Sequence, residues 1–190
     1  MNELDLLKSL PKEQFTEYNG KCVQVRSLIN ILEKQNEKDS SNGTFSCEKN
    51  KMKKILVMGL PGSGKTTLSK VLALRLNAVH FNADEIRKEI NKDLKFSIED
   101  RIEQSRRMKV LCDIVVRSGQ YAIADFVCPT KECQEAFIAE NTYVVWVDRI
   151  KYGRFKDTNK LFYPPENFDI RVNESGDPNH WADLIIENII

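Results

Sequence analysis

The sequence predicts an α/β fold in which a parallel sheet is covered by helices on both faces. Short apolar runs alternate along the chain with segments whose apolar residues recur at helical spacing. The first run, residues 55–58, consists of large aliphatic residues and is followed by a glycine, which is typical of a buried parallel strand. Because parallel strands need crossover connections, this alternation favours helices on the two faces of one sheet.

Each expected element has its own pattern. Leu68, Leu72 and Leu76 recur at helical spacing after the first strand. The segment 97–100 resembles a capping box and opens a long helix, and Thr130 can cap the helix after the third strand. The expected strands are 55–58, 79–81, 121–126, 143–147 and 168–172, and the expected helices are 65–76, 84–91, 97–118, 130–140 and 178–189.

A change in composition near residue 51 divides the chain. Apolar residues within 21–36 lie near helical spacing, which predicts a short amphipathic helix, and a polar linker rich in turn-forming residues follows it. We therefore expect an N-terminal extension over residues 1–51 and a main domain over residues 52–190. The extension is expected to pack on the main domain or to be partly disordered, and a docking segment for a partner is the alternative.

Charge and cysteine content exclude several classes of protein. The 29 Lys and Arg balance the 28 Asp and Glu, so no global positive field favours nucleic acid as a partner. No apolar run is long enough to span a membrane, and the first residues lack a signal core, so we expect a cytoplasmic protein. The number and spacing of the five cysteines argue against a disulfide framework and against a zinc site. They are Cys22, Cys47, Cys112, Cys128 and Cys133.

Residues 59–66 carry the strongest chemical signal, because they fit G-x-x-x-x-G-K-[ST] between an expected strand and an expected helix. Glycines let consecutive backbone N–H groups surround a phosphate, and the helix N-terminus adds partial positive charge. Lys65 is expected to be a catalytic group and the only side-chain cation at this loop, and Thr66 is expected to ligate Mg²⁺. The motif thus predicts a P-loop NTPase-like three-layer sandwich that binds ATP and Mg²⁺. The expected ATP-binding residues are Gly59, Leu60, Pro61, Gly62, Ser63, Gly64, Lys65, Thr66 and Thr67.

Two aspartates lie at the ends of expected strands, where ligands bind in open α/β sheets. Asp84 follows the second strand and could accept the proton of an attacking hydroxyl or hold Mg²⁺. The alternative is that Asp84 only caps the next helix. Asp125 ends the third strand and is a second candidate for the metal side, against a structural hydrogen-bonding role. Which of the two acts on the hydroxyl is left open.

The long helix after Ser97 carries a stripe that is polar at its start and apolar later. Arg101, Gln104, Met108, Leu111 and Val115 follow one another at spacings of three and four. The later half is expected to face the core, and the early half a polar cleft. Arg101 and Gln104 are therefore candidate ligand-binding residues, because a planar guanidinium suits phosphate or sulfate oxygens.

Residues 55–133 resemble the adenylylsulfate kinases, which transfer the ATP γ-phosphate to the 3′-hydroxyl of adenosine 5′-phosphosulfate. Besides the P-loop, four ordered motifs are similar to D-G-D-x-x-R, N-x-D-L-G-F-S, D-R-x-E-N-x-R-R and F-I-S-P, at residues 82–87, 91–97, 100–107 and 126–129 respectively. The resemblance implies that Asp84 is a catalytic carboxylate and that Phe96 stacks on the acceptor's base. It further implies a substrate-binding set of Arg87, Phe96, Arg101, Gln104 and Val127.

The sequence departs from this family at four places. Asn82 replaces the first Asp of D-G-D, Cys128 replaces the Ser of F-I-S-P, and Gln104 replaces an Asn. The family's lid contains a K-G-L-Y-x-K-A-R stretch, whereas the segment 147–162 is shorter and of different composition. Because lids complete the site and exclude water, we expect a change in substrate choice here.

The resemblance implies a kinase that makes 3′-phosphoadenosine 5′-phosphosulfate from adenosine 5′-phosphosulfate, with ATP and Mg²⁺. One alternative is a related kinase acting on another nucleotide hydroxyl, such as that of cytidine diphosphoramidate in capsule biosynthesis. Another alternative is a nucleotide-binding regulatory subunit without turnover. The expected partner is a small nucleotide acceptor, with neither nucleic acid nor membrane. The oligomeric state is left open, with a homodimer as one arrangement.

Overall fold

The computed structural model describes residues 15–18, 21–24, 52–174 and 176–189. The chain forms two compact units, Met1–Glu48 and Lys49–Ile190.

The described part of the first unit is a pair of antiparallel strands, β1 (Phe15–Tyr18) and β2 (Lys21–Gln24). Tyr18 pairs with Lys21, so two residues separate the strands, and their sequence is Asn-Gly, the pair most typical of tight hairpins. The helix expected over 21–36 is therefore wrong at its start, because residues 21–24 form a strand. The rest of that expected helix lies outside the described residues.

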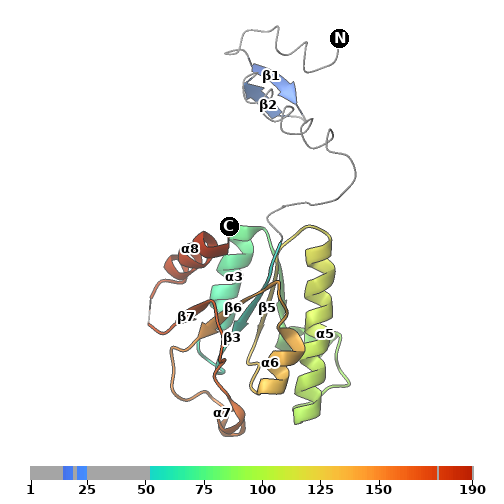
Figure 1. Cartoon of the computed structure of the whole chain (residues 1–190), viewed down its shortest axis with the longest axis vertical. Helices are drawn as coiled ribbons and strands as arrows, with labels where there is room; N and C mark the ends of the chain where they lie inside the picture. The colour runs from blue at the N-terminus through green and yellow to red at the C-terminus, as the bar shows by residue number, and fades with distance from the viewer. Residues whose placement is uncertain (1–14, 19–20, 25–51, 175, 190) are drawn as a thin grey trace. The chain divides into compact units, whose positions relative to one another are not determined.

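The second unit contains a five-stranded sheet in which all neighbouring strands are parallel (Figure 1). The strand order is β4-β5-β3-β6-β7. The bounds are β3 Lys54–Met58, β4 Val79–Asn82, β5 Ala122–Phe126, β6 Thr142–Val147 and β7 Ile170–Val172. Each strand lies within a residue or two of an expected one, so the α/β class predicted from alternation is confirmed.

Six helices accompany this sheet in the described part of the second unit. They are α3 Lys65–Leu76, α4 Ala83–Glu89, α5 Ile98–Arg117, α6 Lys131–Phe137, α7 Lys156–Leu161 and α8 Pro178–Ile189. The sequence pattern did not predict α7, because its six mostly polar residues are too few to show a helical apolar period. No helix among the described residues is long and apolar enough to cross a lipid bilayer.

Two apolar layers enclose the sheet. Successive residues of β3 point to opposite faces, and all five are buried. Ile55 and Val57 pack in a cluster with α3 and α8, whereas Leu56 and Met58 pack with α5 and α6. The predicted three-layer sandwich is thus confirmed, and β3 reads as continuously apolar because both of its faces are covered.

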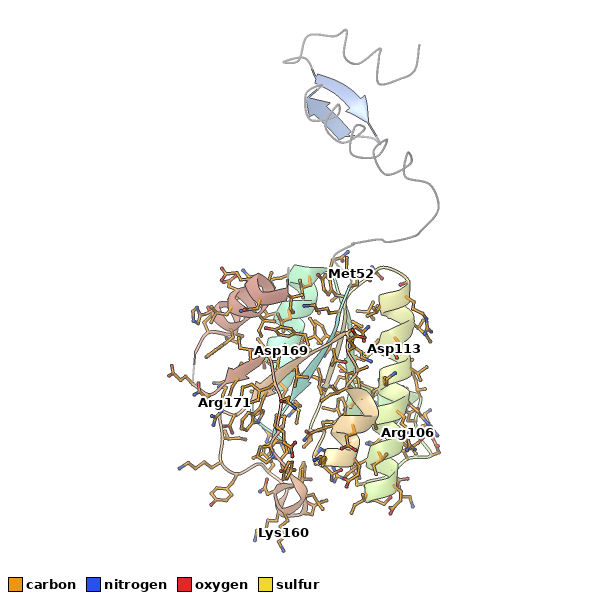
Figure 2. The ribbon with its side chains drawn as sticks, in the orientation of Figure 1. Met52, Arg106, Asp113, Lys160, Asp169 and Arg171 are labelled. Atoms are coloured by element: carbon orange, nitrogen blue, oxygen red, sulfur yellow. The ribbon has the colours of Figure 1, made fainter. Side chains whose placement is uncertain are left out.

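The helices that follow the adjacent strands β3 and β5 lie on opposite faces of the sheet, α3 on one and α6 on the other. Such a reversal opens a crevice at the carboxyl ends of the strands, which is where ligands bind in open α/β sheets. Figure 2 shows Met52 at one end of this unit and Lys160, on α7, at the opposite end. The functional site is therefore expected at the α7 end.

A buried ion pair fixes α5 to the sheet. The Lys54 ammonium is fully buried and donates to Oδ1 of Asp113 at 2.8 Å, while Lys109 donates to Oδ2 at 2.7 Å. Burial lowers the pKa of Lys54, and the hydrogen bond that Lys54 donates to Asp113 opposes that shift. Because α5 also carries Arg101 and Gln104, this contact helps set where those two residues lie.

Candidate active site

The P-loop glycines adopt backbone conformations that L side chains rarely take. The φ angles of Gly59, Gly62 and Gly64 are +144°, +92° and +99°. At Gly59 a Cβ atom would lie 2.2 Å from the carbonyl oxygen of Val147, so no larger residue fits there. The tight loop between β3 and α3 thus follows from the glycines that the sequence motif requires.

Lys65 begins α3 and lies over the loop that precedes it. Its ammonium donates to the carbonyl oxygen of Leu60 at 2.9 Å, and the side chain is 8% exposed. Desolvation lowers the pKa of Lys65 to about 8, although the charges of Asp125 and Asp84 act in the opposite direction. A phosphate bound in the loop would stabilise the charged form of this lysine.

Asn82, not Asp84, caps α4. Its Oδ1 accepts from the backbone N–H groups of Asp84 and Glu85, both at 3.1 Å. The alternative in which Asp84 only caps the helix is therefore wrong, and the Asp84 carboxylate lines the cavity instead. Asn is a preferred cap residue, so the sequence did contain this signal.

Asn82 also joins the two expected metal-side groups. Its Nδ2 donates to Oδ1 of Asp125 at 2.6 Å and lies 3.3 Å from the Thr66 hydroxyl oxygen. The first contact follows from the sheet register, which places Asn82 of β4 beside Asp125 of β5. The residue that sequence analysis treated as a lost carboxylate therefore holds Asp125 and Thr66 together.

Asp125 has a buried carboxylate oxygen to offer a ligand. The side chain is 1% exposed, and its Oδ2 has no hydrogen-bond partner among the described residues. Nε2 of His80 lies 3.5 Å from this oxygen. Mg²⁺ prefers hard oxygen ligands and keeps several waters, so Asp125 and the Thr66 hydroxyl fit it.

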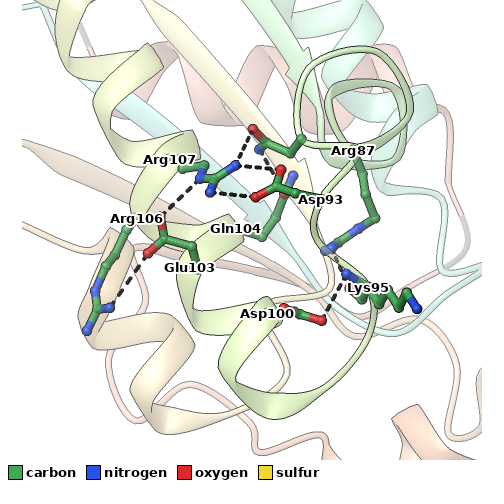
Figure 3. Close-up of polar contacts among 9 residues, drawn as sticks. Arg87, Asp93, Lys95, Asp100, Glu103, Gln104, Arg106 and Arg107 are labelled. Atoms are coloured by element: carbon green, nitrogen blue, oxygen red, sulfur yellow. Dashed lines mark hydrogen bonds and ion pairs between the residues drawn. The ribbon is translucent and has the colours of Figure 1, made fainter.

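Arg87 and Arg101 both lie against the Phe96 ring. Their guanidinium carbons are 4.9 Å and 5.5 Å from the ring centroid, and Phe96 is 62% exposed. Nη1 of Arg87 donates to the carbonyl oxygen of Lys95, while its buried Nε lacks a partner in the described part of the chain (Figure 3). This corner combines an aromatic face with two cations, which suits a nucleotide bearing an anionic group.

Arg101 is 9% exposed and connects α5 to α7. Its Nε donates to the carbonyl oxygen of Phe96 at 3.0 Å, and its Nη2 lies 3.4 Å from the Thr158 hydroxyl oxygen. The same Nη2 lies 3.7 Å from Oδ2 of Asp157. The alternative of a surface ion pair with Glu99 or Glu103 is not what the structure shows.

Gln104 lines the cavity, but its amide is bonded within the protein. Its Nε2 donates to the carbonyl oxygen of Ala83 at 3.2 Å, and its Oε1 accepts from Nδ2 of Asn91 at 2.9 Å. Arg107, one turn further on, forms a bidentate pair with Asp93 at 2.8 and 2.9 Å (Figure 3). The expected contact between Gln104 and substrate stays a prediction, and the contacts seen tie α4 to α5.

One cavity of about 780 Å³ brings most of the expected residues together. From the expected set it is lined by Pro61, Gly62, Gly64, Lys65, Thr66, Thr67, Asp84, Arg87, Phe96, Arg101, Gln104, Asp125 and Val127. Gly59, Leu60 and Ser63 belong to the loop but do not line it. Sequence analysis did not assign the α7 side of the cavity, which consists of Arg154, Phe155, Asp157 and Thr158.

Two further cations lie at the P-loop. A Cβ atom on Gly64 would be 2.8 Å from Nη1 of Arg149, and one on Gly62 would be 3.4 Å from Nε of Arg154. The expectation that Lys65 is the only side-chain cation here is therefore wrong. Both arginines belong to the segment between β6 and α7, whose position only the tertiary structure reveals.

Cys128 occupies the position of the family's Ser and is fully buried, with a φ of +48°. Desolvation raises its pKa well above that of a free thiol. Cys112 and Cys133 are likewise free and buried.

The parallel sheet, the P-loop and the cavity at its carboxyl end define a P-loop nucleotide-binding protein of the kinase type. A sequence profile described as adenylylsulphate kinase matches residues 51–163, more than half of the chain. The chain therefore belongs to the adenylylsulphate kinase family.

Curated relatives agree with this assignment. An adenylyl-sulfate kinase of Clostridium kluyveri is 38% identical over 126 residues, covering 62% of this chain and 63% of that protein. Another from Bacillus licheniformis is 38% identical over 92 residues, covering 45% of this chain and 47% of the relative. The chain thus spans about half to two thirds of the length of these relatives.

Solved structures share the fold. The APS kinase CysC of Mycobacterium tuberculosis, in complex with AMPPNP and APS, superposes with a TM-score of 0.64 at 21% identity. That match covers 72% of this chain and 96% of the other. A hexameric APS kinase from Thiobacillus denitrificans gives a TM-score of 0.60 at 17% identity, covering 94% of this chain and 34% of that one.

Proposed function

We propose that this protein is an ATP-dependent kinase that transfers the γ-phosphoryl group to the 3′-hydroxyl of adenosine 5′-phosphosulfate. The observation that carries the proposal is the single cavity lined both by the P-loop and by the arginines around Phe96. Phosphoryl transfer depends mainly on positioning and on neutralising charge, and these two groups of residues provide both. Membership of the family supports the choice of acceptor.

The P-loop end would hold ATP. Backbone N–H groups of the loop 59–66, other than that of residue 61, which is proline, would surround the phosphates. The Lys65 ammonium, which donates to the Leu60 carbonyl here, would then bind phosphate oxygens instead. Thr66 and Asp125 would hold Mg²⁺, which neutralises charge on the triphosphate. Asn82 keeps these two ligands beside each other.

The other end would hold the acceptor. Phe96 offers an exposed ring to a base, Arg87 and Arg101 offer donors to the anionic group, and Val127 lines the wall. Asp84, freed from capping by Asn82, would accept the proton of the attacking hydroxyl. Water exclusion would come from the segment that carries α7.

A phosphoryl-transfer assay with ATP and Mg²⁺ tests this proposal. The acceptors are adenosine 5′-phosphosulfate, cytidine diphosphoramidate and plain nucleotides. Lys65→Ala should abolish transfer and weaken ATP binding, whereas Lys70→Ala, on the exposed side of the same helix, should behave as wild type. Wild-type turnover by Lys65→Ala, or no transfer to adenosine 5′-phosphosulfate, would contradict the proposal. Transfer to cytidine diphosphoramidate alone would favour that nucleotide as the acceptor, and no transfer to any nucleotide would favour a regulatory nucleotide-binding subunit.

A second candidate acceptor is cytidine diphosphoramidate. The observation that favours it is the Asp157 carboxylate beside Arg101, on a lid segment that differs from the family pattern.

A cytoplasmic location and a homodimeric state complete the proposal. Cell fractionation and sedimentation velocity would test them.

A further inference from the structure

Asp157 places a carboxylate in the part of the cavity that would receive the acceptor's anionic group. It lines the cavity, is 69% exposed, and its Oδ2 lies 3.7 Å from Nη2 of Arg101. Arg101 itself is only 9% exposed and lies against Phe96. A ligand that approaches Arg101 must therefore also approach a negative charge.

The position of Asp157 is fixed by contacts along α7 and on both sides of it. The next residue, Thr158, is buried and meets Arg101. Asn159 bonds both the N–H and the carbonyl of Gly153, which packs so closely on Pro61 that a Cβ there would lie 2.9 Å from the proline ring. After the helix, the N–H of Tyr163 donates to the carbonyl of Pro129 at 2.7 Å. The backbone that carries Asp157 is thus held at the acceptor end by a segment packed on the P-loop.

Arg101 and Asp157 together can distinguish between kinds of anionic group on the acceptor. A guanidinium only donates hydrogen bonds, whereas a carboxylate only accepts them. A sulfate group presents oxygens alone at neutral pH, so it satisfies Arg101 but meets Asp157 as like charge. A phosphoramidate presents oxygens to Arg101 and N–H donors to Asp157, so it satisfies both.

We propose that Asp157 is a specificity-determining residue, which favours acceptors whose terminal anionic group also carries a hydrogen-bond donor over acceptors that present oxygens alone. This inference rests on the proposed function, because it assumes that the Arg101 corner receives the acceptor. Of the two candidate acceptors it favours cytidine diphosphoramidate over adenosine 5′-phosphosulfate. The matching ligand class is a nucleotide with a terminal phosphoramidate or another N–H-bearing anion.

The test compares two acceptors that differ only at the terminal group. Adenosine 5′-phosphosulfate and adenosine 5′-diphosphoramidate share base, sugar and formal charge, but only the second has N–H donors. Values of kcat/KM are measured for both with wild type, Asp157→Asn and Asp157→Ala. Glu140→Gln is the matched control, because Glu140 is exposed and does not line the cavity.

The ratio of kcat/KM for the amidate to that for the sulfate should fall at least tenfold in both Asp157 variants and stay constant in the control. The asparagine variant should gain most with the sulfate, because its amide can donate to an oxygen where the carboxylate could not. An equal loss with both acceptors would mean that Asp157 only orients Arg101, and this would overturn the proposal. An unchanged ratio would overturn it as well.

Calorimetric binding of the same two nucleotides separates failure of this inference from failure of the proposed function. If no variant transfers phosphate but the binding ratio shifts as expected, the kinase proposal fails and the selectivity proposal stands. If transfer proceeds normally and neither ratio shifts, only the selectivity proposal fails.

Discussion

Burial and a few short contacts determine the position and the charge of individual side chains in this site. Lys65 is nearly enclosed and Asp125 has a buried oxygen without a donor, so each would gain a partner when ATP and its metal bind. Arg101 is held by the Phe96 carbonyl and by α7 before any acceptor is present. Two predictions follow from these surroundings, one for each end of the cavity.

At the P-loop, ATP affinity should fall as pH rises through about 8. In the free protein the pKa of Lys65 is about 8, because burial disfavours its charged form, and bound phosphates would raise that pKa. The complex therefore carries more protons than the free protein above pH 8, so the Kd rises by up to tenfold per pH unit there. Titration calorimetry at pH 7, 8 and 9, in buffers of different ionisation enthalpy, would show proton uptake. A Kd that is constant over this range would contradict the prediction.

At the acceptor end, Arg101→Ala should lower kcat/KM for the acceptor by roughly ten- to a hundredfold and leave that for ATP almost unchanged. Loss of one charge-assisted contact costs about 1.5–3 kcal/mol. Arg101→Lys should restore only part, because an ammonium lacks the planar fork of donors. Steady-state kinetics with each substrate varied in turn measures both effects. Arg106→Ala is the control, since Arg106 is 65% exposed and pairs with Glu103; an effect of Arg101→Ala on ATP alone would refute the assignment.

At the scale of elements, the segment between β6 and β7 joins the two ends of the cavity. Gly153 and Arg154 lie against the P-loop, while Asp157 and Thr158 meet Arg101. The segment is held in this shape by Asn159, whose side chain bonds both backbone groups of Gly153 at 2.9 and 3.1 Å. The two hydrogen bonds of Asn159 thus close the turn that leads into this short, mostly polar helix.

Asn159→Ala should therefore loosen the lid without unfolding the sheet. Two hydrogen bonds of about 1 kcal/mol each are lost, and residues 149–156 should become several times more susceptible to trypsin. We expect kcat/KM for both substrates to fall about tenfold while the melting temperature changes by only a few degrees. Asn167→Ala, at an exposed residue outside this cavity, is the control. Unchanged cleavage together with unchanged kinetics would show that the hydrogen bonds between Asn159 and Gly153 are not needed to hold this segment.

At the scale of the whole molecule, the described core of the second unit, Lys49–Ile190, consists of residues between 55 and 189. The cluster with α3 and α8 and the cluster with α5 and α6 both consist of residues in this range. Of the N-terminal residues that the structure describes, 15–18 and 21–24, none belongs to either cluster, and the chain divides into compact units near residue 48.

Removal of residues 1–51 should consequently leave residues 52–190 folded and active. The expected result is a melting temperature within a few degrees of the full chain and unchanged transfer kinetics, because no described core contact is removed. Thermal unfolding followed by circular dichroism, together with the transfer assay, checks both points. A large drop in melting temperature would show that the extension packs as part of the core.

The sequence by itself determined the class of fold and the phosphate-binding end of the site. Short apolar runs predicted all five strands of the main sheet. The signal is strongest for β3, β5 and β6, because most of their residues are buried and must be apolar. The P-loop was predictable because its glycine and lysine requirements arise within eight consecutive residues. Arg101 was found for a similar reason, since its helical stripe is a local pattern.

Only the tertiary structure decided which polar residues, distant in the sequence, contact one another in the site. Asn82 looked like a missing carboxylate, but register with β5 makes it the link between Asp125 and Thr66. Gln104 is occupied by Asn91 and Ala83. The α7 segment gave no period to detect, and its position beside Arg101 depends on contacts between residues 57 positions apart. Such long-range polar contacts produce no periodic pattern in the sequence. The sequence alone therefore could not show that the α7 segment lies at the acceptor end of the cavity.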